Sequence, residues 1–181
     1  MPPKYSERFE KAFMWLMPQE VVYEKGFYGN MNHVTWEDVK FDRGALTKFG
    51  VDQRSHPRTD IKNLTLEQAK EIYWYEYWLP SMAENLPAGY GEVLFDIKVN
   101  GGDGPRLLQA GLNKLGYNLA VDGKIGPRTV GAMNNAGSMG LDKFLDMRQA
   151  RYESLSRSAN RHKFLQGWTN RNNSLRKFVG A

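Results

Sequence analysis

Apolar side chains recur at helical spacing near the start of the chain. The apolar positions are Phe9, Ala12, Phe13, Leu16 and Met17. They follow the i, i+3, i+4, i+7, i+8 order of a half-buried helix, and Ser6 is a suitable N-cap for it. Pro18 disfavours helical geometry at the residue before it. The pattern therefore predicts a helix that ends or kinks at Pro18 and leaves Glu20 just beyond its end.

Residues 21–63 lack a sustained helical pattern. Glycine and asparagine residues between positions 26 and 32 favour turns. Two short apolar segments, Val34–Trp36 and Leu46–Val51, are suited to pair as a small ribbon. We therefore predict an irregular region that contains one β-ribbon.

A second helix is predicted to begin after Thr65. Thr65 and Gln68 have the spacing of a capping box, and Leu64 and Ala69 have that of a hydrophobic staple. The helix is expected to end before Pro80, because proline cannot continue it.

This second helix is unusually aromatic. Its aromatic residues are Tyr73, Trp74, Tyr75, Tyr77 and Trp78. We expect most of the rings in the core, but five aromatic residues in six positions cannot all face inward. Tyr77 and Trp78 are therefore candidates to stack on sugar rings, with burial in the core as the alternative.

The rest of the chain is predicted to be helical. The expected helices are Tyr90–Asn100, residues 105–115, one that begins at Pro127, Leu141–Leu155 and Phe164–Phe178. Similar segments, G-P-R-L-L-Q-A and G-P-R-T-V-G-A, open the second and third of these. Several helices and one small ribbon, without alternation of strand and helix, indicate a predominantly helical α+β protein.

The composition narrows the possible classes. The 181 residues are 41% hydrophobic, enough for a core in one domain or two closely packed lobes. Cysteine is absent, which excludes disulfides and thiolate metal sites, and the histidines lack the spacing of a zinc site. We predict no metal and no cofactor. No apolar run approaches the roughly 18 residues of a membrane span, and the first residues lack the apolar region of a secretory signal.

Positive charge is concentrated towards the end of the chain. The formal net charge is +5, but residues 143–181 alone contain nine Lys and Arg against two acidic residues. Such a segment favours polyanions, which include nucleic acid, an anionic membrane face and anionic cell-wall polymer. A solvated basic surface without a partner is the alternative.

Two carboxyl groups suit glycosidic bond cleavage, which needs a proton donor and a second carboxylate. Glu20 is flanked by apolar residues, where burial would raise its pKa and keep it protonated. Asp42 is in a polar turn, and Thr47 offers a hydroxyl that can orient a water. Spacing alone does not rank Glu20 above the carboxylates of residues 24–38.

Other residue patterns give weaker indications of a functional site. The chain has no G-x-S-x-G motif and no Walker P-loop, and Gly101–Gly104 lacks the preceding strand of a dinucleotide site. Asp96 and Asn100 are one turn apart in an apolar helix. They either satisfy buried backbone groups or line a cleft, and the sequence leaves both interpretations open.

Several motifs, in order, resemble glycoside hydrolase family 108, the N-acetylmuramidase endolysins of phages and prophages. E-V-V-Y at residues 20–23 corresponds to the family's E-G-G-Y motif. D-R-G-A-L-T-K-F-G-V at residues 42–51 corresponds to D-P-G-G-x-T-K-Y-G-I. Segments that resemble the family's second helix, its companion peptidoglycan-binding region and its C-terminal signature are 64–78, 95–105, 121–132 and 164–171.

The resemblance implies a lysozyme-like fold with a small β-ribbon near the active site. Residues 1–90 would form the catalytic lobe and residues 91–181 a helical peptidoglycan-binding region, packed together into one unit. Glu20 would be the general acid, Asp42 would position water or stabilise positive charge, and Thr47 would assist the water. The candidate substrate-binding residues are Tyr23, Tyr77, Trp78 and Asn100.

The implied function is that of an endolysin that cleaves the β-1,4 bond between N-acetylmuramic acid and N-acetylglucosamine. Its partner would be the peptidoglycan glycan strand. The basic C-terminal helices would contact an anionic membrane or wall polymer, and we expect no binding of nucleic acid. We expect a monomer made in the host cytoplasm and released through a holin-type pore to the wall in the periplasm. Val21 and Val22 replace the family's glycines, which keeps a non-catalytic cell-wall-binding protein as the alternative. Retention or inversion stays open, because it depends on the separation of the carboxyl groups.

Overall fold

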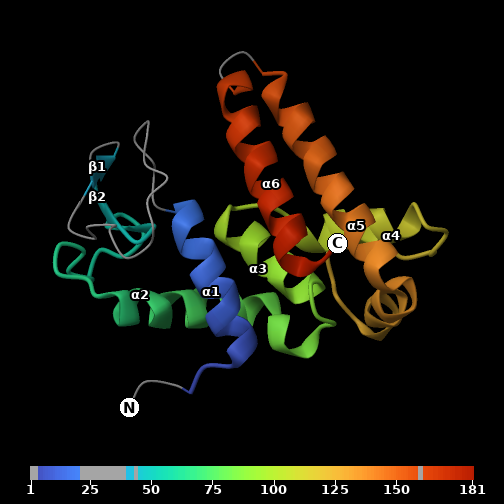
Figure 1. The fold of residues 1–181 in the computed structure, drawn as a ribbon, viewed down its shortest axis with the longest axis horizontal. Helices are drawn as coiled ribbons and strands as arrows, with labels where there is room; N and C mark the ends of the chain where they lie inside the picture. The colour runs from blue at the N-terminus through green and yellow to red at the C-terminus, as the bar shows by residue number, and fades with distance from the viewer. Residues whose placement is uncertain (1–3, 21–39, 43–44, 159–160) are drawn as a thin grey trace. The chain divides into compact units, whose positions relative to one another are not determined.

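The computed structural model describes residues 4–20, 40–42, 45–158 and 161–181. The chain forms two compact units, Met1–Glu76 and Tyr77–Ala181. Taken together, the described residues are mostly helical, and the first unit contains a small antiparallel sheet, which confirms the predicted α+β class (Figure 1). In the described part of the chain, no helix is long and apolar enough to cross a membrane.

Helix α1 (Glu7–Glu20) opens the first unit and continues through Pro18. The expected end of the helix at Pro18 is therefore wrong, and Glu20 is the last helical residue instead of lying beyond the helix. Proline lacks the N–H group that would bond to the carbonyl of Met14. So close to the end of the helix, this removes a single backbone hydrogen bond, and the last residues keep helical geometry.

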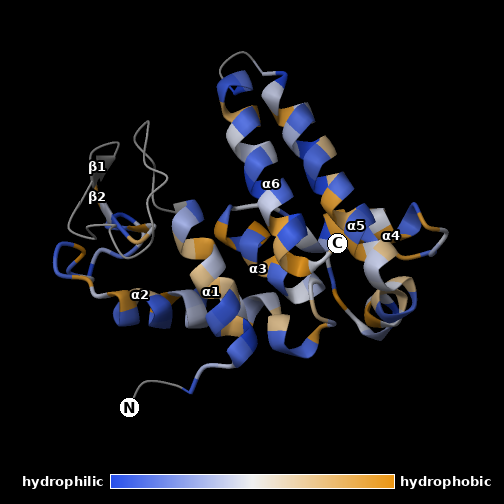
Figure 2. Ribbon diagram, viewed as in Figure 1, coloured by the Kyte–Doolittle hydropathy of each residue, from blue (hydrophilic) through white to orange (hydrophobic). Residues whose placement is uncertain are grey.

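The apolar face of α1 packs against aromatic rings from later in the unit. The ring centroids of Phe9 and Trp74 are 4.9 Å apart, and those of Phe13 and Tyr73 are 5.6 Å apart, both pairs edge to face. Figure 2 shows hydrophobic residues along α1 interrupted by hydrophilic ones, as expected of a half-buried helix. Both phenylalanines are fully buried, and burial of one such side chain stabilises a fold by roughly 1.5–3 kcal/mol.

Helix α2 (Leu66–Tyr73) begins where the capping box predicts. The Thr65 Oγ1 accepts a hydrogen bond from the Gln68 N–H (3.2 Å), and the Gln68 Oε1 accepts one from the Thr65 N–H (2.9 Å). The aromatic part then continues as a π-helical turn, η2 (Trp74–Trp78), and a 3₁₀ turn, η3 (Leu79–Ser81). The predicted helix is therefore present, but its backbone widens at residue 74.

Strands β1 (Lys40–Asp42), β2 (Ala45–Lys48) and β3 (Val51–Asp52) form an antiparallel sheet in that order. The predicted strand in Leu46–Val51 is thus part of the sheet. The partner predicted for it, Val34–Trp36, lies outside the described residues.

A two-residue turn joins β2 to β3. Its residues, Phe49 and Gly50, have φ angles of 52° and 74°, the positive values of a type I′ hairpin turn. A positive φ is uncommon for phenylalanine. The Tyr73 hydroxyl donates a hydrogen bond to the Phe49 carbonyl at 3.0 Å, and this bond fixes the turn, and with it the register of β2 and β3.

The second unit is built from four α-helices with short helical turns between them. The helices are α3 (Tyr90–Val99), α4 (Gly104–Asn113), α5 (Pro127–Ser156) and α6 (Leu165–Val179); the turns are η4 (Ala83–Asn85) and η5 (His162–Phe164). Helices α5 and α6 lie side by side (Figure 1).

Helix α5 joins two helices that the sequence predicts separately. At Gly137 the backbone leaves helical geometry, with φ 52° and ψ −134°, a combination open essentially to glycine. The Tyr90 hydroxyl donates a hydrogen bond to the Gly137 carbonyl at 2.8 Å. Burial raises the pKa of Tyr90 to about 12, so this hydroxyl stays a donor at any ordinary pH and holds the kink against α3.

Helix α4 carries its own start signal and secures the next turn. The Asp103 side chain accepts a hydrogen bond from the Arg106 N–H. The Gln109 side chain is buried, donates to Asp122 (2.9 Å) and accepts from the Gly123 N–H (2.9 Å). The predicted turn at residues 122–123 is thus fastened to α4 by one glutamine.

Candidate active site

Thr47 lies in the middle strand of the sheet. It pairs with Lys40 on one side and with Asp52 on the other. Asp42 pairs with Ala45, two positions before Thr47. The register therefore brings the backbone of two predicted site residues, Asp42 and Thr47, close together.

The predicted acid, Glu20, is the last residue of α1. Its side chain, the side chain of Asp42 and the whole of Tyr23 lie outside what the structure describes. The approach of the Glu20 and Asp42 carboxyls to each other therefore stays a prediction.

A further carboxylate, which no sequence pattern indicates, lies beside Thr47. Directly opposed residues of an antiparallel pair present their side chains on one face, so Asp52 shares a face with Thr47. The side chain and backbone N–H of Arg54 hydrogen-bond to Asp52, and these bonds lower the pKa of Asp52 to about 2. Asp52 is therefore a fixed anion next to Thr47 and is unsuited to donate a proton. Only the register set by the turn at Phe49 reveals it.

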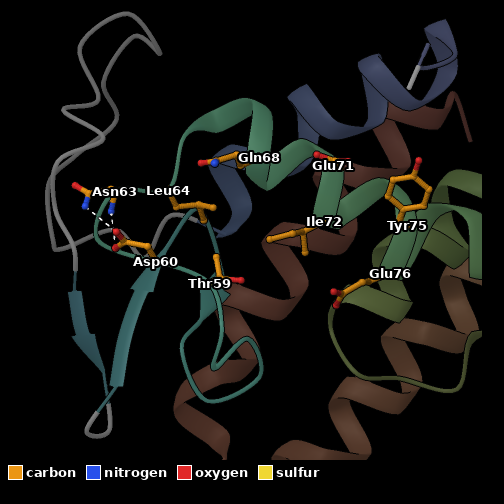
Figure 3. A pocket seen from close by; sticks show the side chains of 9 residues that line it. All are labelled: Thr59, Asp60, Asn63, Leu64, Gln68, Glu71, Ile72, Tyr75 and Glu76. Atoms are coloured by element: carbon orange, nitrogen blue, oxygen red, sulfur yellow. Dashed lines mark hydrogen bonds between the residues drawn. The ribbon is translucent and has the colours of Figure 1, made fainter. Parts of the chain in front are cut away.

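A groove of about 460 Å³ lies in the first unit, between the loop of residues 59–64 and the α2–η2 segment (Figure 3). Its polar lining includes Asp60, Asn63, Gln68, Glu71, Tyr75 and Glu76. Thr47 does not line this groove. The groove is a concave polar surface, formed by described residues of the unit that contains the sheet.

Two of the predicted substrate-binding aromatic residues are in η2, and they differ in burial. Tyr77 is half-buried. Trp78 is 0% exposed, donates from Nε1 to Glu84 at 2.7 Å, and packs edge to face on Phe95 at 5.2 Å. Trp78 is thus a core residue, and its position gives no support to stacking on a sugar.

Asp96 is the centre of a buried ionic cluster in the second unit. It is 0% exposed and forms ion pairs with Arg148 of α5 and Arg171 of α6. Burial by itself raises the pKa of Asp96, but the two guanidinium groups outweigh it and hold the pKa below its usual value. Neither interpretation from the sequence, a buried backbone partner or a cleft, describes Asp96, which instead joins three helices.

Asn100, the fourth candidate for substrate binding, lies beside this cluster. It is an exposed residue at the end of α3. With its amide oxygen turned inward, it accepts hydrogen bonds from Arg148 Nη2 and Arg171 Nε, each at 3.1 Å. Asn100 therefore supports the arginines that Asp96 neutralises, and its role towards substrate stays a prediction.

Eight of the nine cations from Lys143 onward fall into two groups. The first, here called the hairpin base, comprises residues that each pair with an aspartate: Lys143, Arg148, Arg171 and Arg176. The second, the hairpin tip, comprises residues that are all exposed: Arg151, Arg157, Arg161 and Lys163. Among the described residues, no ion pair involves a cation of the hairpin tip.

Aromatic rings accompany the hairpin tip. Phe164 is 41% exposed, and its ring stacks on Trp168, with centroids 5.8 Å apart. Trp168 stacks in turn on Tyr152 at 5.4 Å. The Lys163 ammonium lies 5.1 Å from the centre of the Phe164 ring. The tip thus combines exposed positive charge with an exposed aromatic surface.

Two known families match the chain in succession. Residues 22–102 match the family described as Glycosyl hydrolase 108. The chain therefore carries a glycosyl hydrolase 108 domain. Residues 103–173 match a family described as Predicted Peptidoglycan domain. Together the two matches confirm the resemblance found in the motifs, and they identify the protein as a glycosidase with peptidoglycan as its expected partner.

A solved structure has a similar fold. The structure of Brucella abortus SagA is 23% identical in sequence, with 94% of each chain covered and a TM-score of 0.63. At this level of identity the likeness concerns the fold alone. No curated protein matches the sequence significantly.

Proposed function

We propose that the protein is a peptidoglycan hydrolase that cleaves the β-1,4 bond between N-acetylmuramic acid and N-acetylglucosamine. The observation that carries this proposal is the succession of a glycosyl hydrolase 108 domain and a predicted peptidoglycan domain in one chain. A glycosidase fused to a domain for the wall polymer has its substrate in that polymer. Lysis of a bacterial host, as by a phage endolysin, is the biological role that we propose for it.

In this proposal Glu20 is the general acid. It ends α1, where the partial negative charge of the helix terminus disfavours ionisation of a carboxyl group. Asp42 and Thr47, two register positions apart in the sheet, would position the water or stabilise positive charge in the transition state. Asp52, ionised beside Thr47, adds negative charge on the same face.

The test is substitution of the acid. Glu20→Gln is expected to reduce clearance of outer-membrane-permeabilised cells by at least about 100-fold, the scale of general acid catalysis, with little change in thermal stability. Glu7→Gln, which removes an exposed carboxylate from the first turn of the same helix, is the matched control and should lyse cells like the parent. Unreduced lysis by Glu20→Gln would sink the assignment.

A non-catalytic wall-binding protein is the second candidate. It is favoured by the match of residues 103–173 to the peptidoglycan domain and by the valines that follow Glu20. Pull-down with purified murein, scored together with release of reducing sugar, separates the two candidates. Binding without release of sugar would favour the second.

We further propose that the hairpin tip contacts an anionic surface at the wall, either a membrane or a wall polymer. Four exposed cations without ion pairs in the described part of the chain, next to the exposed Phe164, support this. Such contacts suit a protein that reaches the periplasm through a holin-type pore and acts close to a membrane.

A further inference from the structure

One wall of the groove in the first unit is one face of a continuous helical segment. The residues that line it from this segment are Gln68, Glu71, Ile72, Tyr75 and Glu76. Their i, i+3, i+4, i+7, i+8 spacing is that of a single helix face, and Figure 3 shows their side chains along it. The last two belong to the π-helical turn η2. Such turns are rare and occur frequently at functional sites.

Some of the polar groups in the groove are already hydrogen-bonded. Asn63 donates to Asp60 from its backbone N–H (3.3 Å) and from its amide nitrogen (2.8 Å). One carboxylate oxygen of Glu76 is 3.0 Å from the His56 ring nitrogen Nε2. These bonds orient Asp60 and Glu76, and each keeps acceptor capacity for a further hydrogen bond.

Other polar groups in the groove are open to a ligand. The amide oxygen of Gln68 caps α2, which leaves its Nε2 without a partner among the described residues. The Glu71 carboxylate is exposed, and no ion pair or hydrogen bond to it occurs in the described part of the chain. A hydrogen-bond donor and an acceptor thus lie one helical turn apart on the same wall.

Tyr75 adds an aromatic surface to these polar groups. It is 51% exposed, so its ring is accessible to a ligand. An aromatic ring offers a flat apolar face, and the tyrosine hydroxyl adds a polar end. A flat ring next to amide and carboxylate groups suits a sugar, which has apolar C–H faces and a rim of hydroxyl groups.

The charge of the groove restricts the ligand further. Among the described residues that line it, three are carboxylates and none is a lysine or arginine. Phosphate and carboxylate ligands would be repelled. A neutral sugar with an acetamido group is compatible, because its N–H and hydroxyl groups donate to carboxylates and its carbonyl accepts from an amide.

We propose that this groove binds an N-acetylglucosamine unit of a glycan strand, with Tyr75 as the stacking surface and Gln68 and Glu71 as hydrogen-bond partners. The proposal rests on the proposed function only in taking the glycan of the wall as the source of the sugar. It adds to the hydrolase domain a binding site whose described lining does not include Thr47.

The experiment is a titration of the full chain, carrying Glu20→Gln to prevent turnover, with the tetramer of N-acetylglucosamine. Amide shifts in the NMR spectrum locate the bound sugar, and residues 59–64 and 68–76 are expected to respond. Tyr75→Ala should weaken binding about tenfold, a loss of one aromatic stacking contact, and Glu71→Gln should weaken it less. Tyr75→Phe keeps the ring and should bind within about twofold of the parent.

The matched control is Glu67→Gln, which removes a carboxylate of α2 that pairs with Lys70 and does not line the groove. It should bind the tetramer like the parent. Because Tyr75 is half exposed, Tyr75→Ala is expected to unfold at nearly the parent temperature, and thermal melts check this.

Three results would overturn the proposal. The first is equal affinity of the tetramer for Tyr75→Ala and the parent, and the second is a response confined to residues outside the groove. The third is tight, strongly salt-dependent binding of lysine amide in place of the sugar, which would make the groove a site for ammonium groups. All three are independent of lysis, so failure of the proposed function, seen as lysis by Glu20→Gln, is distinguishable from failure here.

Discussion

The hairpin base and the hairpin tip use the same residue types in opposite ways. At the base, Arg148 is 2% exposed and Arg171 is 10% exposed, and both meet Asp96. At the tip, Arg157 and Lys163 are exposed, and neither has an ion-pair partner among the described residues. A buried charge must be neutralised, whereas an exposed charge is solvated by water. The arginines of the base therefore hold helices together, and those of the tip remain available to a partner.

The largest effect is expected at the base. Asp96→Ala leaves two buried guanidinium groups without their counter-charge, and removal of one partner from a buried ion pair costs about 3–5 kcal/mol. Urea unfolding followed by circular dichroism measures the loss. Glu153→Ala, an exposed acid of the same hairpin, is the control and should stay within about 0.5 kcal/mol of the parent. If Asp96→Ala also lost no more than about 0.5 kcal/mol, the cluster would contribute no measurable stability.

The next effect concerns pH. The pKa of Asp96 is lowered in the folded protein, so its contribution to stability is complete above the unfolded pKa of about 3.9. It is lost as the pH falls from there through the lowered pKa. The difference in unfolding free energy between the parent and Asp96→Asn should thus be constant near neutral pH and shrink in acid. A difference that grows on acidification would contradict the direction of the shift.

The smallest effect on stability, and a clear one on binding, is expected at the tip. Arg157→Ala combined with Lys163→Ala should change the unfolding free energy by less than about 0.5 kcal/mol. At about 1 kcal/mol per cation near an anionic surface, the pair should weaken binding to vesicles that contain phosphatidylglycerol by roughly thirtyfold. Sedimentation with the vesicles at low and moderate salt measures this.

The control for the tip removes the same charge elsewhere. Lys98→Ala with Lys114→Ala, two exposed lysines of the second unit outside the hairpin, should bind the vesicles nearly as the parent does. Equal losses in the two double variants would mean that net charge, and not the tip, governs binding. Retention on purified wall polymer but not on vesicles would identify the polymer as the anionic surface.

Signals that act over a few residues were readable from the sequence. The capping box of α2 joins residues three positions apart, and it formed as predicted. The apolar stripe of α1 was equally local and formed the core of its unit. The predicted end of the helix at Pro18 was wrong, because the effect of a proline depends on its distance from the end of the helix.

Features that depend on distant residues were not readable. Asp96 meets arginines 52 and 75 positions later in the chain, and no local pattern connects them. Asp52 reached Thr47 only through the turn at Phe49, whose positive φ no propensity for phenylalanine predicts. The motifs did identify the family, and so singled out Glu20, Asp42 and Thr47, because ordered motifs carry information that single residues lack.

The cluster at Asp96 also bears on how such proteins can be recombined. Asp96 lies in the segment that matches the glycosyl hydrolase family, while Arg148 and Arg171 lie in the segment that matches the peptidoglycan domain. The two family matches meet at residue 102. An exchange of wall-targeting modules at this point would separate Asp96 from both of the arginines that pair with it. A junction at residues 76–77, between the compact units, keeps them together, so the point at which two families meet is not the point at which this chain can be cut.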